Sequence, residues 1–68
     1  MPTAAIVLDD WKLATFKRML TEAGYTFTEH EGVTSDTVTL KVVATNMIML
    51  GEVVKACNMA AEQSRRLN

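Results

Sequence analysis

The sequence predicts a small α+β domain with the element order (β)αββα, and three stretches of the chain carry this prediction. Residues 10–23 repeat apolar side chains with the period of a helix. Residues 25–31 and 37–44 alternate with the period of a strand on either side of a turn. Residues 47–66 place their apolar side chains on one wide helical arc. The 68 residues, positions 1–68, form a single domain because a chain of this length has room for one core.

The first element is the apolar run TAAIVL at residues 3–8. It fits either a buried strand or an ordered arm. Ile6, Val7 and Leu8 favour the strand, because bulky and β-branched residues suit a pleated surface.

The first helix spans about Asp10 to Ala23. Asp9 or Asp10 is expected to cap its start, because a short carboxylate accepts hydrogen bonds from the amides of the first turn. Gly24 is expected to end it, because the residue after a helix often takes a positive φ that only glycine adopts without strain. The core stripe consists of Leu13, Phe16, Leu20 and Ala23, with Met19 at its margin. The opposite side carries Trp11, Thr15, Arg18 and Glu22, so the one tryptophan points away from the core.

A β-hairpin is expected after this helix. The run YTFTEHE places residues 25, 27 and 29 on one face and Thr26, Thr28 and His30 on the other. In TVTLKVVA, residues 38, 40 and 42 share a face, and the opposite face carries Thr37, Thr39, Lys41 and Val43. The five residues GVTSD between the two runs have the composition of a turn and suit a hairpin connection.

The last helix is expected to start at a Thr45 or Asn46 cap and to run to about Arg66. Gly51 costs this helix about 1 kcal/mol against alanine and is expected on its exposed side. The apolar arc consists of Leu50, Val53, Val54, Cys57, Ala60 and Ala61. The opposite side carries Glu52, Lys55, Asn58 and Glu62, with Arg65 and Arg66 near the end, where they complement the helix dipole.

This order matches the split βαββαβ pattern of ferredoxin-like domains, truncated before its last strand. In that arrangement both helices cover one face of an antiparallel sheet, and the first strand lies at an open edge that can pair with another chain. A domain this small buries only about 60% of the surface that its unfolded chain exposes. We therefore expect the fold to be completed by oligomerisation, as a homodimer or a higher oligomer.

Composition excludes several classes of function. The net charge is −1, without an arginine-rich run, so we expect no DNA partner. No stretch has the length of a membrane span or the pattern of a signal peptide, so we expect a cytoplasmic protein without a membrane partner. One cysteine and one histidine leave no internal disulfide and no standard zinc site.

Motifs of catalysis are also missing from the sequence. The three glycines are far apart and form no phosphate-binding loop, and no cysteine–histidine or histidine–carboxylate spacing suggests an enzyme. Cys57 lies on the core arc of the last helix, where a small buried hydrophobe explains it better than a nucleophile. We predict a protein that is not an enzyme and needs no metal or cofactor.

Two groups of residues are candidates for binding. Trp11 offers a flat surface at low entropic cost and has Lys12 on one flank and Arg18 two turns along, a combination that suits a nucleotide or an acidic protein surface. The alternative is that Trp11 folds back over the Ile6 to Leu8 segment or covers the end of the sheet. The second group, on the open face of the hairpin, includes Thr28, His30, Thr39 and Lys41. It suits an anionic ligand or a dimer interface, and the alternative is a solvated outer face rich in threonine.

The runs VLDDWKLATFKRMLTEAGYTFTE and TVTLKV resemble small uncharacterised proteins encoded by tailed phages and prophages. The resemblance covers most of the chain and lies in the overall pattern. It implies an accessory protein made in the host cytoplasm, of a kind that commonly inhibits a host factor or sequesters a host signal. Some phage counter-defence proteins are small oligomers that bind cyclic nucleotides between subunits without cleaving them.

Two functions are therefore predicted. The first is a homo-oligomeric protein, possibly a host-defence inhibitor, that sequesters a small anionic, nucleotide-like ligand through Trp11, Lys12 and Arg18 together with the hairpin face. The second is an inhibitor or adaptor that binds a host protein through the exposed helix face around Trp11.

Overall fold

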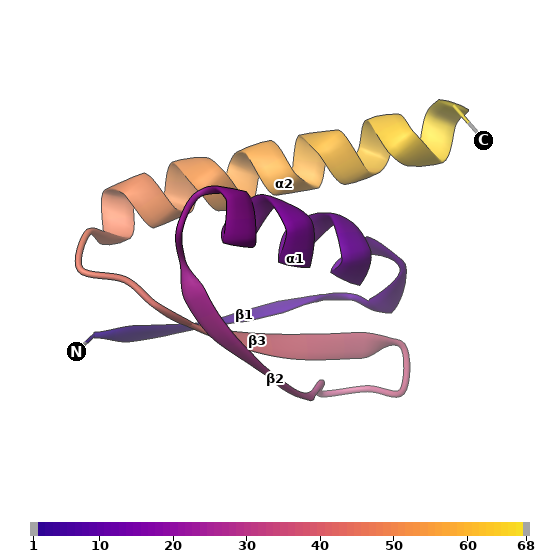
Figure 1. Cartoon of the computed structure of the whole chain (residues 1–68). Helices are drawn as coiled ribbons and strands as arrows, with labels where there is room; N and C mark the ends of the chain where they lie inside the picture. The colour runs from indigo at the N-terminus through magenta and orange to yellow at the C-terminus, as the bar shows by residue number, and fades with distance from the viewer. Residues whose placement is uncertain (1, 68) are drawn as a thin grey trace.

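The structure, a computed structural model, describes residues 2–67 and their side chains as far as Arg65. Figure 1 shows two helices lying across one face of a three-stranded sheet. This α+β arrangement confirms the predicted fold class, including the strand ahead of the first helix. In chain order the elements are β1 (Thr3–Asp9), the short 3₁₀ helix η1 (Asp10–Lys12), α1 (Leu13–Glu22), β2 (Thr26–Glu31), β3 (Thr37–Val43) and α2 (Met47–Leu67).

The sheet has the strand order β1-β3-β2, and both of its pairings are antiparallel. Ile6 of β1 lies opposite Leu40 of β3, and Glu29 of β2 lies opposite the same residue. The predicted hairpin of β2 and β3 is therefore confirmed. Because β3 is central, β1 and β2 are the two edge strands, and β1 pairs with β3 alone.

The core lies between the sheet and the helices, as the apolar patterns predict. Its largest fully buried side chains are Phe16, Leu20, Leu40, Val42 and Cys57. Ala23 was predicted to belong to the core stripe, but it is exposed. The stripe ends one turn earlier because Ala23 is the C-cap residue, where the chain already turns away from the helix.

The start of the first helix differs from the predicted aspartate cap. Neither η1 nor α1 has a side-chain hydrogen bond at its N-cap, so Asp9 does not cap the segment as expected. The backbone N–H of Asp10 instead donates to the carbonyl of Asp36 in the β2–β3 turn, at 2.8 Å. A tight 3₁₀ turn joined to the hairpin therefore takes the place of a capped α-helical turn.

Gly24 ends α1 as predicted, with a φ of 85°. The Gly24 N–H donates to the Thr21 carbonyl at 3.0 Å, and the Tyr25 N–H donates to the Leu20 carbonyl at 2.9 Å. These two bonds form a Schellman motif, which satisfies carbonyls that the helix end would otherwise leave free. The positive φ explains the glycine, because other L-residues pay a steric cost in this conformation.

Asn46 confirms one of the two predicted caps of the last helix. Its Oδ1 accepts hydrogen bonds from the backbone N–H groups of Ile48 and Met49, at 3.1 and 3.0 Å. With 21 residues α2 is about 32 Å long, whereas a seven-residue strand spans about 24 Å. The C-terminal end of α2 therefore projects past the sheet, as Figure 1 shows.

Candidate functional site

Trp11 lies on η1 beside the projecting end of α2. Its side chain is 40% exposed, which confirms that it lies outside the core. The Arg65 guanidinium carbon lies 4.8 Å from the centre of the Trp11 ring system, and the Lys12 Nζ lies 5.2 Å from it. Both distances are within the range of cation–π contacts. Trp11 therefore joins the start of the first helix to the end of the last.

Lys12 is already engaged by α2. Its Nζ donates to Asn58 Oδ1 at 3.2 Å and lies 3.9 Å from Glu62 Oε1. Asn58 was predicted on the solvent side of α2, but it is partly buried because it faces Lys12. The Lys12 ammonium is thus bound within the protein and is less available to a ligand than an exposed lysine.

The cations near Trp11 are not the predicted pair. The ring has Lys12 and Arg65 beside it, whereas Arg18 is exposed on α1 and makes no hydrogen bond or ion pair with the described side chains. Sequence reasoning missed Arg65 because its distance of 54 residues from Trp11 hides the contact. A base that stacks on Trp11 would compete with the Arg65 guanidinium for the ring face that it covers.

The four predicted residues of the hairpin lie together on the sheet face opposite the helices. His30 is paired with Thr39, and Thr28 is paired with Lys41. His30 Nε2 and Thr28 Oγ1 are 2.7 Å apart and share a hydrogen bond. This face thus presents one ammonium group beside hydroxyls and an imidazole, and Val7 of β1 adds an apolar side chain next to Thr39.

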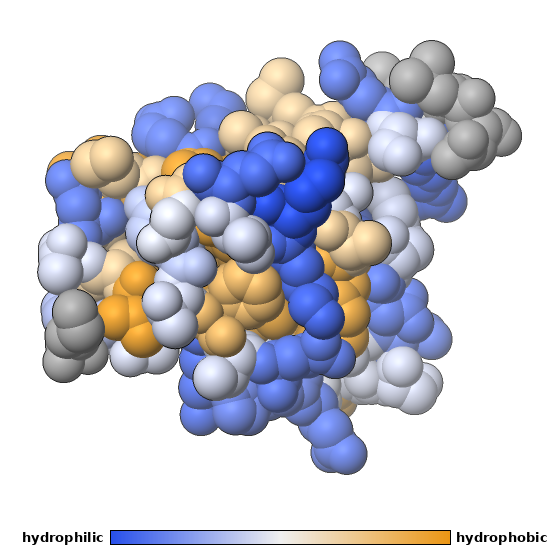
Figure 2. Space-filling view, viewed as in Figure 1, coloured by the Kyte–Doolittle hydropathy of each residue, from blue (hydrophilic) through white to orange (hydrophobic). Residues whose placement is uncertain are grey.

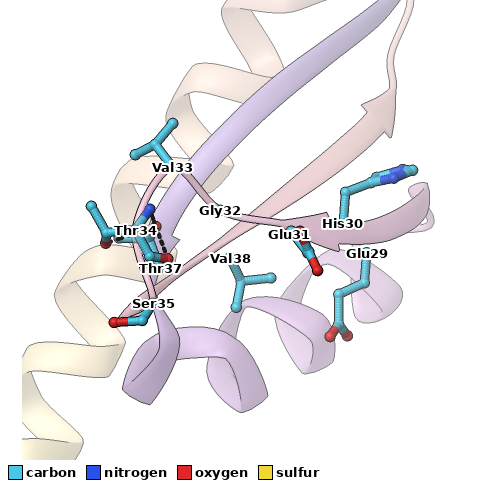
Figure 3. Close-up of a pocket in the computed structure, with 9 residues that line it drawn as sticks. All are labelled: Glu29, His30, Glu31, Gly32, Val33, Thr34, Ser35, Thr37 and Val38. Atoms are coloured by element: carbon cyan, nitrogen blue, oxygen red, sulfur yellow. Dashed lines mark hydrogen bonds between the residues drawn. The ribbon is translucent and has the colours of Figure 1, made fainter.

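A hollow of about 670 Å³ surrounds the β2–β3 turn, and Figure 3 shows the residues that line it. The Thr37 hydroxyl is held in the turn by the Thr34 backbone, and Gly32 packs so closely against Thr37 that a side chain there would collide with it. Glu29 and Glu31 contribute two carboxylates, which repel anions. Because this hollow includes only His30 of the predicted binding residues, it does not fit the expected anionic ligand.

A second cleft of about 270 Å³ runs along the free edge of β1, between this strand and α2; we call it the β1 cleft. Apolar side chains form most of its wall, and polar groups from η1, β3 and α2 lie at the end near the β2–β3 turn. Its lining residues are Ile6, Val7, Leu8, Asp9, Lys12, Phe16, Thr37, Val54 and Asn58. The cleft lies next to β1 because β1 pairs with β3 alone and has no strand on its outer side.

The two edge strands differ in charge. Residues 3–8 of β1 carry no charged side chain, and Asp9 stands only at the end of the strand. The outer strand β2 carries Glu29 and Glu31, and Glu29 forms an ion pair with Lys17 of α1 at 3.1 Å. Figure 2 shows polar side chains over much of the face on which α1 and β2 lie in front. Charged edge residues deter pairing with other strands, so β2 is protected and β1 is not.

The remaining chemical groups form no further site in the described part of the chain. Cys57 is fully buried, and burial raises the pKa of its thiol, partly offset by a backbone hydrogen bond. Within residues 2–65, histidine, cysteine and acidic side chains form no group of three that could hold a metal ion. No helix in the described chain has both the length and the apolarity to cross a membrane.

No family model, curated protein or solved structure matches the chain. Its resemblance to small tailed-phage proteins therefore stays a prediction.

Proposed function

We propose that this chain is a non-catalytic protein-interaction domain, an adaptor or inhibitor, that binds another polypeptide along the free edge of β1. The observation that carries the proposal is the β1 edge itself, which is uncharged over residues 3–8 and borders an apolar cleft. An open strand edge presents a row of backbone N–H and C=O groups, and strand addition uses these groups for affinity. The cleft adjoining them gives room for side chains of the bound segment.

The contrast between the two edges supports this function over a general stickiness of the fold. Soluble domains commonly protect edge strands with charges, and β2 carries such charges while β1 does not. The expected thiol and imidazole chemistry is also weak, because Cys57 is buried and His30 is bonded to Thr28. These observations favour binding over catalysis.

Selection from a displayed library of random peptides tests the proposal, together with sedimentation of the free protein to detect self-association. The test variant is Ile6→Lys, whose charge would be trapped beside apolar side chains once another strand covers the edge. The matched control is Thr26→Lys on the protected strand β2, where the side chain is exposed. We expect any selected peptide, or any self-association, to be lost in Ile6→Lys and retained in Thr26→Lys. Binding that is indifferent to Ile6→Lys, or no binding of either kind, would contradict the proposal.

A second candidate function is capture of a small anionic ligand on the open sheet face. The juxtaposition of Thr28, His30, Thr39 and Lys41 favours it, because hydroxyl and ammonium groups there converge on one surface. Trp11 and Arg18 belong to the segment on the other side of the sheet, so this version of the nucleotide hypothesis relies on the sheet face alone. The Lys41 ammonium is the charge that an anion would contact.

Calorimetric titration with a panel of mono-, di- and cyclic nucleotides tests this second candidate. We expect a nucleotide that binds wild-type protein to lose about tenfold in affinity in Lys41→Met, the size of one charge-assisted contact. Lys55→Met on the solvent side of α2 is the matched control and should leave the affinity unchanged. Absence of heat with every nucleotide would remove this candidate.

A further inference from the structure

The helix layer of this domain is wider than its sheet. Two packed helices cover about 20 Å, because neighbouring helix axes lie up to about 10 Å apart. Three strands cover only about 14 Å at about 4.8 Å per strand. The two helices therefore have room beneath them for about one more strand than the sheet supplies.

The unfilled width lies on the β1 side. Val54 and Asn58 of α2 line the same cleft as Ile6 and Leu8 of β1, so α2 stands over the position next to β1. Leu8 is buried by its neighbours, whereas Ile6 is only partly buried at this edge. On the other side, the Lys17–Glu29 ion pair joins α1 directly to the outer strand β2. The missing strand position is therefore bounded by β1, α2 and solvent.

We propose that the partner at this position is a single extended segment of another protein, which becomes a fourth strand beside β1 and beneath α2. This inference rests on the proposed function and specifies its partner. The segment needs no charge along its length, because residues 3–8 of β1 carry none. Its alternate side chains are apolar and enter the β1 cleft beside Ile6 and Val54, while the intervening ones lie next to Ala5 and Val7 on the open face.

A second copy of the chain is a poorer fit for the same position. Two copies joined through their β1 strands would form a sheet of six strands, about 29 Å wide, beneath four helices that need about 40 Å. The excess width of the helix layer would double, whereas one added strand removes it. The α2 helix of each copy would also stand over the β1 strand of the other, where the first copy's own α2 already lies. A segment without its own helix has no such conflict.

The volume of the cleft agrees with side chains from a strand and not with a larger element. About 270 Å³ equals roughly nine water molecules at liquid density, enough for a few aliphatic side chains. A helix about 10 Å in diameter would not fit between β1 and α2. The polar end, where Lys12 and Asn58 lie, provides hydrogen-bonding groups beside the start of η1.

A synthetic peptide of about seven residues, in which threonine and valine alternate, tests this inference because it presents apolar side chains on one face only. Its binding is measured by fluorescence polarisation, and the subunit number of the free protein is measured by sedimentation equilibrium. Amide hydrogen exchange of β1 and β2, with and without the peptide, locates the bound strand without a variant. The same peptide with proline at its centre is the matched control, because proline cannot donate to a strand ladder.

We expect a monomer of 7.5 kDa that binds one peptide, with slower exchange in β1 than in the free protein and unchanged exchange in β2. Ile6→Lys should weaken peptide binding by about tenfold or more, and the proline peptide should bind no better than background. A dimer that Ile6→Lys dissociates and that excludes the peptide would overturn the inference while leaving the proposed function intact. No peptide binding and no dimer through β1 would overturn both.

Discussion

At the scale of single residues, Cys57 links burial to the pH dependence of stability. Its side chain is fully buried in the core, and burial raises the pKa of its thiol above the ordinary value of 9.0. The folded protein therefore holds the thiol neutral at a pH where the unfolded chain ionises it. The stability that this provides is complete below about pH 9 and is lost as the pH rises through the folded-state pKa.

We predict that the free energy of unfolding falls between about pH 9 and pH 10.5 in wild-type protein and falls less steeply in Cys57→Ala. Urea titrations at a series of pH values measure the two slopes, and Cys57→Ala also corrects for the other groups that titrate in this range. The alanine variant should be less stable overall, because it leaves a small cavity. Parallel slopes for the two proteins would show that the thiol ionises equally in both states. Rapid reaction of Cys57 with an aromatic disulfide in native buffer would contradict its burial.

The contact between Trp11 and Arg65 gives a second prediction at this scale. The guanidinium carbon lies 4.8 Å from the ring centre, so Arg65→Ala removes a cation–π contact worth about 0.5 to 1 kcal/mol at an exposed site. We expect that loss in urea unfolding, together with a change in the emission of the only tryptophan. Lys55→Ala, also on α2 but pointing to solvent, is the control and should change the stability by less. Equal effects of the two substitutions would show that the Trp11 contact contributes nothing.

At the scale of elements, two glycines with opposite surroundings give a matched pair. Gly24 has a φ of 85° at the end of α1, so Gly24→Ala forces a side chain into a strained conformation and should cost about 1 kcal/mol. Gly51 lies within α2, and a Cβ built there meets nothing within 4 Å. Gly51→Ala should therefore stabilise the domain by up to about 1 kcal/mol through helix propensity alone. Urea midpoints measure both, and a gain in Gly24→Ala would contradict the Schellman end of α1.

Sequence patterns predicted these elements well because their signals are local. The period of residues 25–31 and 37–44, with a turn between them, specified the hairpin, and Asn46 and Gly24 marked helix ends through their own backbone preferences. Asp9 was a wrong prediction because its helix begins at a turn whose backbone bond comes from Asp36, distant in sequence. Local signals cannot report such a bond.

The candidate site was predicted less well, for the same reason. The β1 cleft exists because α2 projects over a strand that is missing from the sheet, and this depends on how elements 45 residues apart are packed. The sequence did carry one usable signal, the absence of charge over residues 3–8 beside the charged run at 29–31. It predicted an open first edge but not that Val54 and Asn58 would stand above it.

At the scale of the whole molecule, the domain combines a small core with an incomplete layer. A chain of 68 residues buries a modest fraction of its surface, and the edge strand contributes Ile6 and Ala4 only partly buried. A strand added beside β1 would cover this apolar surface and supply hydrogen bonds to its free edge. Binding and stability are therefore expected to rise together.

A thermal shift measures this coupling. A ligand that binds only the folded state stabilises it by about 2.7 kcal/mol when its concentration is 100 times the dissociation constant. For a domain of this size each kcal/mol raises the melting temperature by about 4 to 8 °C, so the alternating threonine–valine peptide should raise it by about 10 °C or more. The Ile6→Lys protein should show almost no shift at the same peptide concentration, and Thr26→Lys should respond as wild type does. A shift equal in Ile6→Lys and wild type would place the peptide away from β1, because a lysine at position 6 cannot be covered by a strand without burying its charge.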